Sequence, residues 1–275
     1  MTLHPMPDQY FYPPPMLQEF ISAYFLSSYD TIGFEHTPIC VYPTGSAVLC
    51  FSLDKPFIFK EMASGLIIRH TKFNFVHQFR EPRFYQVIAC PSKVLHVVFK
   101  PYGAYRLLGI PQNSSFDRHG TALTDILTDR VKDLLHQIED ASSNAVLVVK
   151  LVNEWLKAQF IKHEKISVGR VSHACKLIVD NRGNLSIEQL AQEVWLSKRA
   201  LEYQFQEQVG LSPKMYCRIT RFNALLTRIQ NDTVNDFQEL VDHYNYFDQA
   251  HLIKEFKFFS GNPPTFLPET RVIVS

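Results

Sequence analysis

The chain has 275 residues, of which 46% are hydrophobic and 20% charged, and its formal net charge at pH 7 is +1. This composition is typical of a well-buried globular protein and excludes a disordered or fibrous one. The sequence holds no run of about 18 apolar residues, the length that spans a bilayer, and no Lys or Arg precedes Lys55. We therefore expect a cytoplasmic protein without a secretory signal or membrane contact.

The five cysteines are widely spaced and include no C-x-x-C pair. This pattern argues against a disulfide framework or a zinc module, so we expect five buried thiols. They are Cys40, Cys50, Cys90, Cys175 and Cys217.

Residues 1 to about 118 are rich in Phe, Tyr and Val and are punctuated by Pro and Gly. Short apolar runs predict an antiparallel β domain, either a sandwich or barrel-like. The runs lie at 37–42, 47–53, 57–60, 66–69, 72–79, 84–89 and 94–99. Before them, residues 17–24 fit a helix and a strand equally well.

From about 121 to 163 the apolar residues change to a helical period, which predicts two helices joined by residues 140–144. Such a pair packs either on the β domain of its own chain, which we favour, or on a second subunit. A polar segment at 161–165 then divides the chain into a β-rich domain with its helix pair (1–164) and an all-α domain (165–275). The predicted fold class is therefore α+β with two domains.

A constant offset of 51 residues relates two stretches of the all-α domain. Each stretch has a good N-cap residue, two large apolar residues four apart on one helical face, and then Gly and Pro. Ser197, Leu201, Phe205, Gly210 and Pro213 recur as Asp248, Leu252, Phe256, Gly261 and Pro264. The pattern predicts two helix-turn-helix units, at about 186–209 and 235–260.

The local signals around these units are also specific. Ser186 and Gln189 fit a capping box before the first unit, and Thr233 or Asn235 fits the N-cap of the second. Between the units, residues 213–229 form a predicted helix of roughly 25 Å at 1.5 Å per residue. With its turns, this spacer could hold two recognition helices about 34 Å apart, which is one turn of DNA.

The combined pattern is long and specific. It runs Leu190-Ala191-x-x-Val194-x-Leu196-Ser197-x-x-x-Leu201-x-x-x-Phe205-x-x-x-x-Gly210-x-Ser212-Pro213, then Asn245-Tyr246-x-Asp248-Gln249-Ala250-His251-Leu252-x-Lys254-x-Phe256-Lys257-x-x-x-Gly261-x-Pro263-Pro264. In this it resembles the AraC/XylS-type transcription regulators. The resemblance covers about residues 168–268 and implies a seven-helix DNA-binding domain, usually fused to a regulatory domain.

Two segments near the N-terminus, 41–45 (Val-Tyr-Pro-Thr-Gly) and 99–103 (Phe-Lys-Pro-Tyr-Gly), resemble the β-rich domain of a subset of these regulators. The chain also departs from the family pattern. Trp195 and Asn245 stand at turn positions where the family often has Gly, and Asn is the next best residue for a left-handed turn.

The resemblance also places candidate DNA contacts. Side chains expected at base edges are Arg199, Glu202 and Tyr203 in the first unit and Gln249, His251 and Lys254 in the second. Side chains expected at phosphates are Lys198, Lys214, Arg218, Arg221 and Lys257. Double-stranded DNA is thus the expected partner, with RNA polymerase, a small-molecule effector and a second copy of the chain as further candidates.

Charge is distributed unequally between the two units. Residues 185–228 hold six Lys or Arg against four Asp or Glu, whereas residues 232–260 hold two against six. We therefore expect the first unit to dominate DNA affinity. Because the whole domain is near neutral, a protein interaction module that kept the scaffold without DNA binding is the alternative.

We expect no enzyme activity, cofactor or metal. The sequence lacks a Gly-rich phosphate loop, a G-x-S-x-G elbow and an H-E-x-x-H motif, and His36, His70, His77 and His96 are isolated from one another. Aromatic residues of the β domain form either its core, which we favour, or an apolar effector pocket. The pocket candidates are Phe51, Phe59, Phe73, Phe75 and Tyr85.

Overall fold

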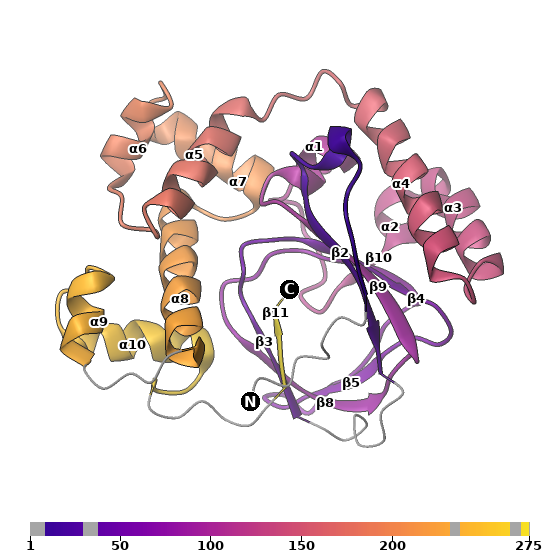
Figure 1. The fold of residues 1–275 in the computed structure, drawn as a ribbon, viewed down its shortest axis with the longest axis horizontal. Helices are drawn as coiled ribbons and strands as arrows, with labels where there is room; N and C mark the ends of the chain where they lie inside the picture. Colours follow the sequence, from indigo (N-terminus) through magenta and orange to yellow (C-terminus); the bar gives the residue numbers. More distant parts are fainter. Residues whose placement is uncertain (1–8, 30–37, 232–236, 265–270, 275) are drawn as a thin grey trace.

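The computed structural model describes residues 9–29, 38–231, 237–264 and 271–274 (Figure 1). A β-rich part at 9–122 is followed by helices, which confirms the predicted fold class. The described part of the chain has no helix long and apolar enough to cross a membrane. All five cysteines are free thiols, four of them buried and Cys50 half-buried.

Two sheets form the β-rich part. The first has the order β1 (Gln9–Phe11), β2 (Ile21–Ser28), β9 (Lys93–Phe99), β4 (Val48–Ser52), β7 (Phe73–Val76) and β10 (Thr121–Ala122). The second has the order β11 (Arg271–Val274), β3 (Pro38–Tyr42), β8 (Arg83–Ala89), β5 (Ile58–Glu61) and β6 (Ile67–Arg69). Every one of the seven predicted apolar runs overlaps a strand.

Four features of the fold differ from the sequence prediction or go beyond it. Residues 17–24 give a short 3-10 turn (Pro15–Leu17) and then β2, so the strand alternative is the correct one. A helix, α1 (Gly103–Leu108), follows β9 without having been predicted. Near the C-terminus β11 returns to pair in parallel with β3, where we had expected no strand.

The fourth difference lies in the helix pair. Its first helix is divided into α2 (Leu123–Leu127) and α3 (Asp129–Asp140) by Thr128, whose φ of 50° interrupts the helical backbone. Its second helix is α4 (Ala145–Lys162), which Asn144 caps by accepting a hydrogen bond from the Leu147 N–H. Buried residues of the pair belong to the same core as the first sheet, so the pair packs within its own chain.

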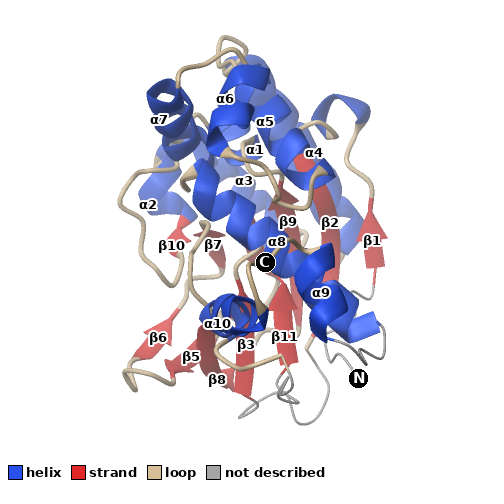
Figure 2. Cartoon of the chain, turned by 90° about the vertical axis from the view of Figure 1, so that its left-hand side faces the viewer, coloured by secondary structure: helices blue, strands red, loops and turns tan. Residues whose placement is uncertain are grey.

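The C-terminal part contains six described helices, which Figures 1 and 2 show grouped around α8. They are α5 (Gly169–Asp180), α6 (Ile187–Glu193), α7 (Lys198–Val209), α8 (Pro213–Asn231), α9 (Phe237–His243) and α10 (Gln249–Ser260). In both views α5, α6 and α7 lie near one end of α8, and α9 and α10 lie near the other.

A continuous apolar core joins the β-rich and helical parts, and the two short segments singled out in the sequence lie at this junction. Tyr42 packs edge-on against Phe222 of α8, with ring centres 5.8 Å apart. Asn223 donates a hydrogen bond to the Pro43 carbonyl at 3.1 Å. Gly45 lies so close to the Tyr216 ring that a β-carbon there would come within 2.6 Å of it.

A close backbone contact at Gly183 in the helical part can be tested against Gly65, a glycine of the β-rich part with the same backbone conformation and no such contact. Both have φ near +75°, where an L side chain is strained by about 1–2 kcal/mol. A β-carbon at Gly183 would lie 2.1 Å from the Cys217 carbonyl oxygen, whereas one at Gly65 meets nothing within 4 Å. We expect Gly183→Ala to lower the melting temperature far more than the matched Gly65→Ala. Equal losses in thermal unfolding would contradict this account of the contact.

Candidate nucleic-acid interface and internal cavity

The first helix-turn-helix unit consists of α6 and α7, and both begin as the sequence predicts. Ser186 and Gln189 form the predicted capping box, with both hydrogen bonds present. Ser197 caps α7 by accepting a hydrogen bond from the Ala200 N–H at 3.2 Å. Leu201 and Phe205 are fully buried, which leaves the opposite face of α7 outward.

The second unit consists of α9 and α10. Asp248 caps α10 by accepting a hydrogen bond from the His251 N–H at 2.7 Å, and Leu252 and Phe256 are fully buried. The predicted N-cap residues of α9, Thr233 and Asn235, lie outside the described residues. The turn between the helices is described in full, and it differs from that of the first unit.

The two turns share one backbone conformation but differ in length. Trp195 and Asn245 both adopt positive φ, 55° and 54°, at the positions where the related pattern often has Gly. These two residues are 50 apart, while the caps Ser197 and Asp248 are 51 apart. The second turn therefore holds one extra residue, Phe247, directly before its cap.

Both second helices end in the same way, against the β-rich part of the chain. Gly210 and Gly261 are left-handed C-caps with φ of 82° and 77°. Gly210 packs on Gln112, whose N–H donates to the Glu207 carbonyl at 2.7 Å. Gly261 packs on the ring of Phe84 in β8. It is thus the C-terminal caps of α7 and α10, and not their N-terminal caps, that contact the β-rich part.

The residues predicted to face base edges differ in how exposed their side chains are. Arg199, Tyr203, Gln249, His251 and Lys254 are exposed on α7 and α10. Glu202 is half-buried and accepts a hydrogen bond from the Gln206 side chain at 3.3 Å. Arg199 and Tyr203 lie four residues apart and share a helical face, which leaves the first unit with an adjacent exposed pair.

Three of the residues predicted to bind phosphate are exposed, namely Lys198, Lys214 and Lys257. Lys198 also pairs with Glu188 of α6. The other two are engaged inside the helical domain. Arg218 makes a two-pronged ion pair with Glu255 of α10, at 2.8 and 2.9 Å. Arg221 donates to the Gly183 carbonyl, in the loop between α5 and α6, at 2.9 Å, so both guanidinium groups are bound within the helical part.

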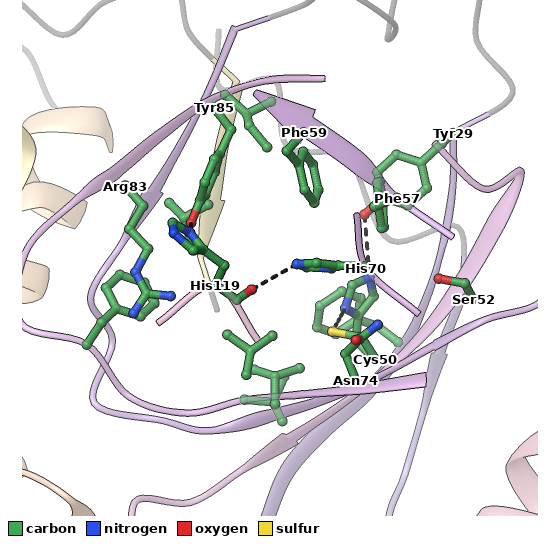
Figure 3. A pocket seen from close by; sticks show the side chains of 18 residues that line it. Tyr29, Cys50, Ser52, Phe57, Phe59, His70, Asn74, Arg83, Tyr85 and His119 are labelled. Atoms are coloured by element: carbon green, nitrogen blue, oxygen red, sulfur yellow. Dashed lines mark hydrogen bonds between the residues drawn. The ribbon is translucent and has the colours of Figure 1, made fainter. Parts of the chain in front are cut away.

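A cavity of about 110 Å³ lies between the two sheets of the β-rich part (Figure 3). Its wall is mostly aromatic and aliphatic and includes Phe25, Tyr29, Phe57 and Phe59. Strand alternation explains which residues reach it, because successive side chains point to opposite faces. In β3, Ile39 and Val41 line the cavity, while Cys40 and Tyr42 belong to the core shared with α8.

The same alternation divides the predicted pocket residues. Phe59 and Tyr85 line the cavity. Phe51, Phe73 and Phe75 lie in the large core outside the cavity, since their neighbours Cys50, Asn74 and Val76 are the ones that face it. These three rings are therefore core residues, and they do not line this cavity.

A polar cluster occupies one end of the cavity (Figure 3). The Tyr85 hydroxyl lies 3.0 Å from Nδ1 of His119, and Nε2 of His70 lies 2.8 Å from the His119 carbonyl oxygen. Arg83 also lines the cavity, with its guanidinium 4.1 Å from the centre of the Phe79 ring. Arg83 and Phe79 further line a polar cleft of about 500 Å³ that extends to Gln206 and Gly210 of the α7 end.

Sequence reasoning missed His119, Arg83 and Gln112, because nothing in their local pattern marks them. They meet only when β8 and the loop after α1 are folded together. Within the described part of the chain, no group of three or more His, Cys, Asp or Glu side chains could hold a metal ion. His36 lies outside the described residues.

His96 makes the stability of the β domain depend on pH. Burial lowers its pKa to about 4, and its ring contacts Tyr29, at 3.4 Å, and Cys50. The unfolded chain, with a pKa near 6.5, binds this proton more readily, so stability should fall as the pH drops from about 6.5 towards 4. Half-buried His77, whose pKa burial also lowers to about 4, adds to this slope.

We therefore expect His96→Gln to flatten part of the pH profile of the melting temperature between pH 6.5 and 4. The exposed His173 offers the matched control, because His173→Gln makes the same change without the burial. An unchanged slope in His96→Gln would contradict the assignment.

Comparison with known proteins gives a family model and several solved structures. Residues 9–121, from β1 to the first residue of β10, match a family described as "Domain of unknown function (DUF6597)". No curated protein matches the sequence. The chain is similar to ToxT of Vibrio cholerae at 7% identity and a TM-score of 0.45, over 88% of this chain and 96% of that one.

A second ToxT structure, with an unsaturated fatty acid bound, is similar at 9% identity and a TM-score of 0.42, over 88% of this chain and 94% of that one. Both likenesses concern the arrangement of the chain and carry over no residue role. The matched family covers the β-rich part, and the helical part with its two helix-turn-helix units lies beyond the matched residues.

Proposed function

We propose that this protein is a sequence-specific DNA-binding transcription regulator whose β-rich domain senses a small effector. The observation that carries the proposal is the pair of capped helix-turn-helix units on α8. At 1.5 Å per residue, the 19 residues of α8 span roughly 28 Å, close to the spacing of successive major-groove turns. The N-terminal part of a recognition helix is the part that reaches base edges in such units.

The proposed contacts follow from the exposure of each side chain. Arg199 suits guanine and Gln249 suits adenine, while Tyr203, His251 and Lys254 lie beside them on the same helices. Lys198, Lys214 and Lys257 are the proposed phosphate contacts. We leave Arg218 and Arg221 out of this set, because their guanidinium groups are bound to Glu255 and the Gly183 carbonyl.

The two units should contribute unequally to DNA affinity. The first holds the exposed Lys198 and Arg199 at the start of α7, whereas the second lies in the segment with six acidic residues against two basic ones. We expect Lys198→Ala with Arg199→Ala to weaken binding of a mixed-sequence duplex more than Lys254→Ala with Lys257→Ala. The first pair should also lower the slope of log affinity against log salt by about 1, since Lys198 is its phosphate contact and each such contact adds about 0.9.

Fluorescence anisotropy of a labelled duplex over a salt series measures both quantities. Equal losses from the two double variants would overturn the ranking of the units. A native chain that binds no duplex even at low salt would overturn DNA binding itself and favour an interaction module, because a DNA reader gains affinity steeply as salt falls.

The cavity supports a small ligand with an apolar body and one anionic group. A volume of about 110 Å³ is close to that of a buried cavity, about 150 Å³, that holds benzene in another protein. Arg83 is the cationic side chain in its wall, and burial lowers the pKa of its guanidinium. An anion beside Arg83 would offset the cost of keeping that charge partly buried.

Strand β3 offers a physical route from this cavity to the DNA-binding helices. Ile39 and Val41 face the cavity. Cys40 and Tyr42, which alternate with them along the strand, belong to the core shared with α8. A ligand that shifts β3 would therefore act on the Tyr42–Phe222 contact. Arg83 adds a second route, since the cleft that it lines reaches the end of α7.

Benzoate and toluene make a matched pair of probes, because they share the ring and differ in the carboxylate. We expect benzoate to raise the melting temperature, as any ligand that binds the folded state does, and toluene to raise it less. Arg83→Gln should remove the advantage of benzoate. Equal shifts with both probes in the native chain would contradict the role given to Arg83.

A further inference from the structure

The turn of each helix-turn-helix unit carries one aromatic side chain that is almost fully exposed. Trp195 is 87% exposed and Phe247 is 90% exposed. Both stand just before the N-cap of the second helix, Trp195 two residues before Ser197 and Phe247 directly before Asp248. Large aromatic side chains usually dominate cores and interfaces, so two exposed rings at corresponding turns call for a partner.

The backbone of Trp195 is strained, in addition to its side chain being exposed. Its φ of 55° is a left-handed conformation that Gly or Asn adopts readily and a bulky residue does not. Residues with a strained backbone tend to cluster at functional sites, because neither packing nor backbone preference accounts for such a residue there. Asn245 occupies the equivalent backbone position of the second unit with a residue suited to it.

Three cationic side chains flank Trp195, one of which, Lys198, pairs with Glu188. The Arg170 guanidinium lies 3.4 Å from the Trp195 carbonyl oxygen, and Lys198 and Arg199 begin the helix that follows. An apolar ring among three cations complements a nucleic acid, which presents phosphates beside the apolar sugar and thymine methyl groups of the groove wall. It does not complement a lipid-like or purely apolar partner equally well.

We propose that Trp195, and Phe247 at the second unit, pack against the wall of the DNA groove as the start of each recognition helix enters it. The proposal rests on the DNA binding proposed above and adds two contact residues that the related pattern does not mark. Arg170 and Lys198 bind the flanking phosphates and Arg199 reaches a base edge, while the Trp195 ring covers deoxyribose carbons or a thymine methyl.

The fluorescence of Trp195 tests the contact directly, because the chain has just two tryptophans. In a Trp155→Phe background, Trp195 is the single tryptophan, and excitation at the red edge of its absorption band selects it over the tyrosines. We expect saturating mixed-sequence duplex to shift its emission to the blue and to reduce acrylamide quenching severalfold. Should Trp155→Phe fail to fold, quenching in the native chain serves, since Trp155 is half-buried and Trp195 is open to the quencher.

Affinity variants separate a DNA contact from a structural role of the turn. Trp195→Asn should raise the melting temperature, because Asn suits the left-handed backbone, and yet weaken duplex binding about tenfold, within the range of aromatic contacts to bases. Trp195→Phe should restore most of the affinity. Tyr12→Ala, which removes a 91% exposed aromatic ring from the β-rich part, is the matched control and should bind as the native chain does.

The outcomes are distinct. Duplex binding by anisotropy with no change in Trp195 emission or in Trp195→Asn affinity overturns this inference and leaves the proposed function standing. No duplex binding by the native chain overturns both. A loss of affinity confined to thymine-containing duplexes supports the inference and assigns the contact to the methyl group, while an equal loss on duplexes without thymine assigns it to the sugars.

Discussion

Phe222 is the residue on which the arrangement of the whole molecule depends. Phe222 is a buried residue of α8. Its ring contacts Tyr42 of β3 and two rings of α10, Phe256 and Phe259, with ring centres 5.2 to 5.8 Å apart. One side chain thereby joins the β-rich part, α8 and α10. Because cores are close-packed, α8 cannot move against β3 without disturbing α10 as well.

This constraint relates the two candidate sites. The cavity lies on one face of β3 and Phe222 lies towards the other. Strand β3 therefore connects the wall of the cavity to the ring that packs against α10. The left-handed glycines at the ends of α7 and α10 add two further contacts with the β-rich part. The β-rich part thus touches both recognition helices at the ends opposite to those proposed to enter DNA.

Much of this was predictable from local sequence, and what was not has a physical reason. Caps such as Ser186, Ser197 and Asp248, and the C-cap Gly210, depend on residues within one turn and were read correctly. The strand β11, the pairing of Arg218 with Glu255 and the cluster of Arg83 with His119 depend on contacts between distant segments. No local pattern encodes such contacts, so the resemblance could assign Arg218 to a phosphate and still miss its partner Glu255.

The proposed function requires that α7 and α10, held on α8 and against the β-rich part, read one DNA molecule together. Hydroxyl-radical footprinting on a duplex selected for tight binding by the full chain tests it most directly. We expect two stretches of protected deoxyribose about one helical turn apart along the duplex, with the stretch flanking α7 the better protected. A single protected segment confined to one turn would contradict it, because α10 would then be absent from the DNA.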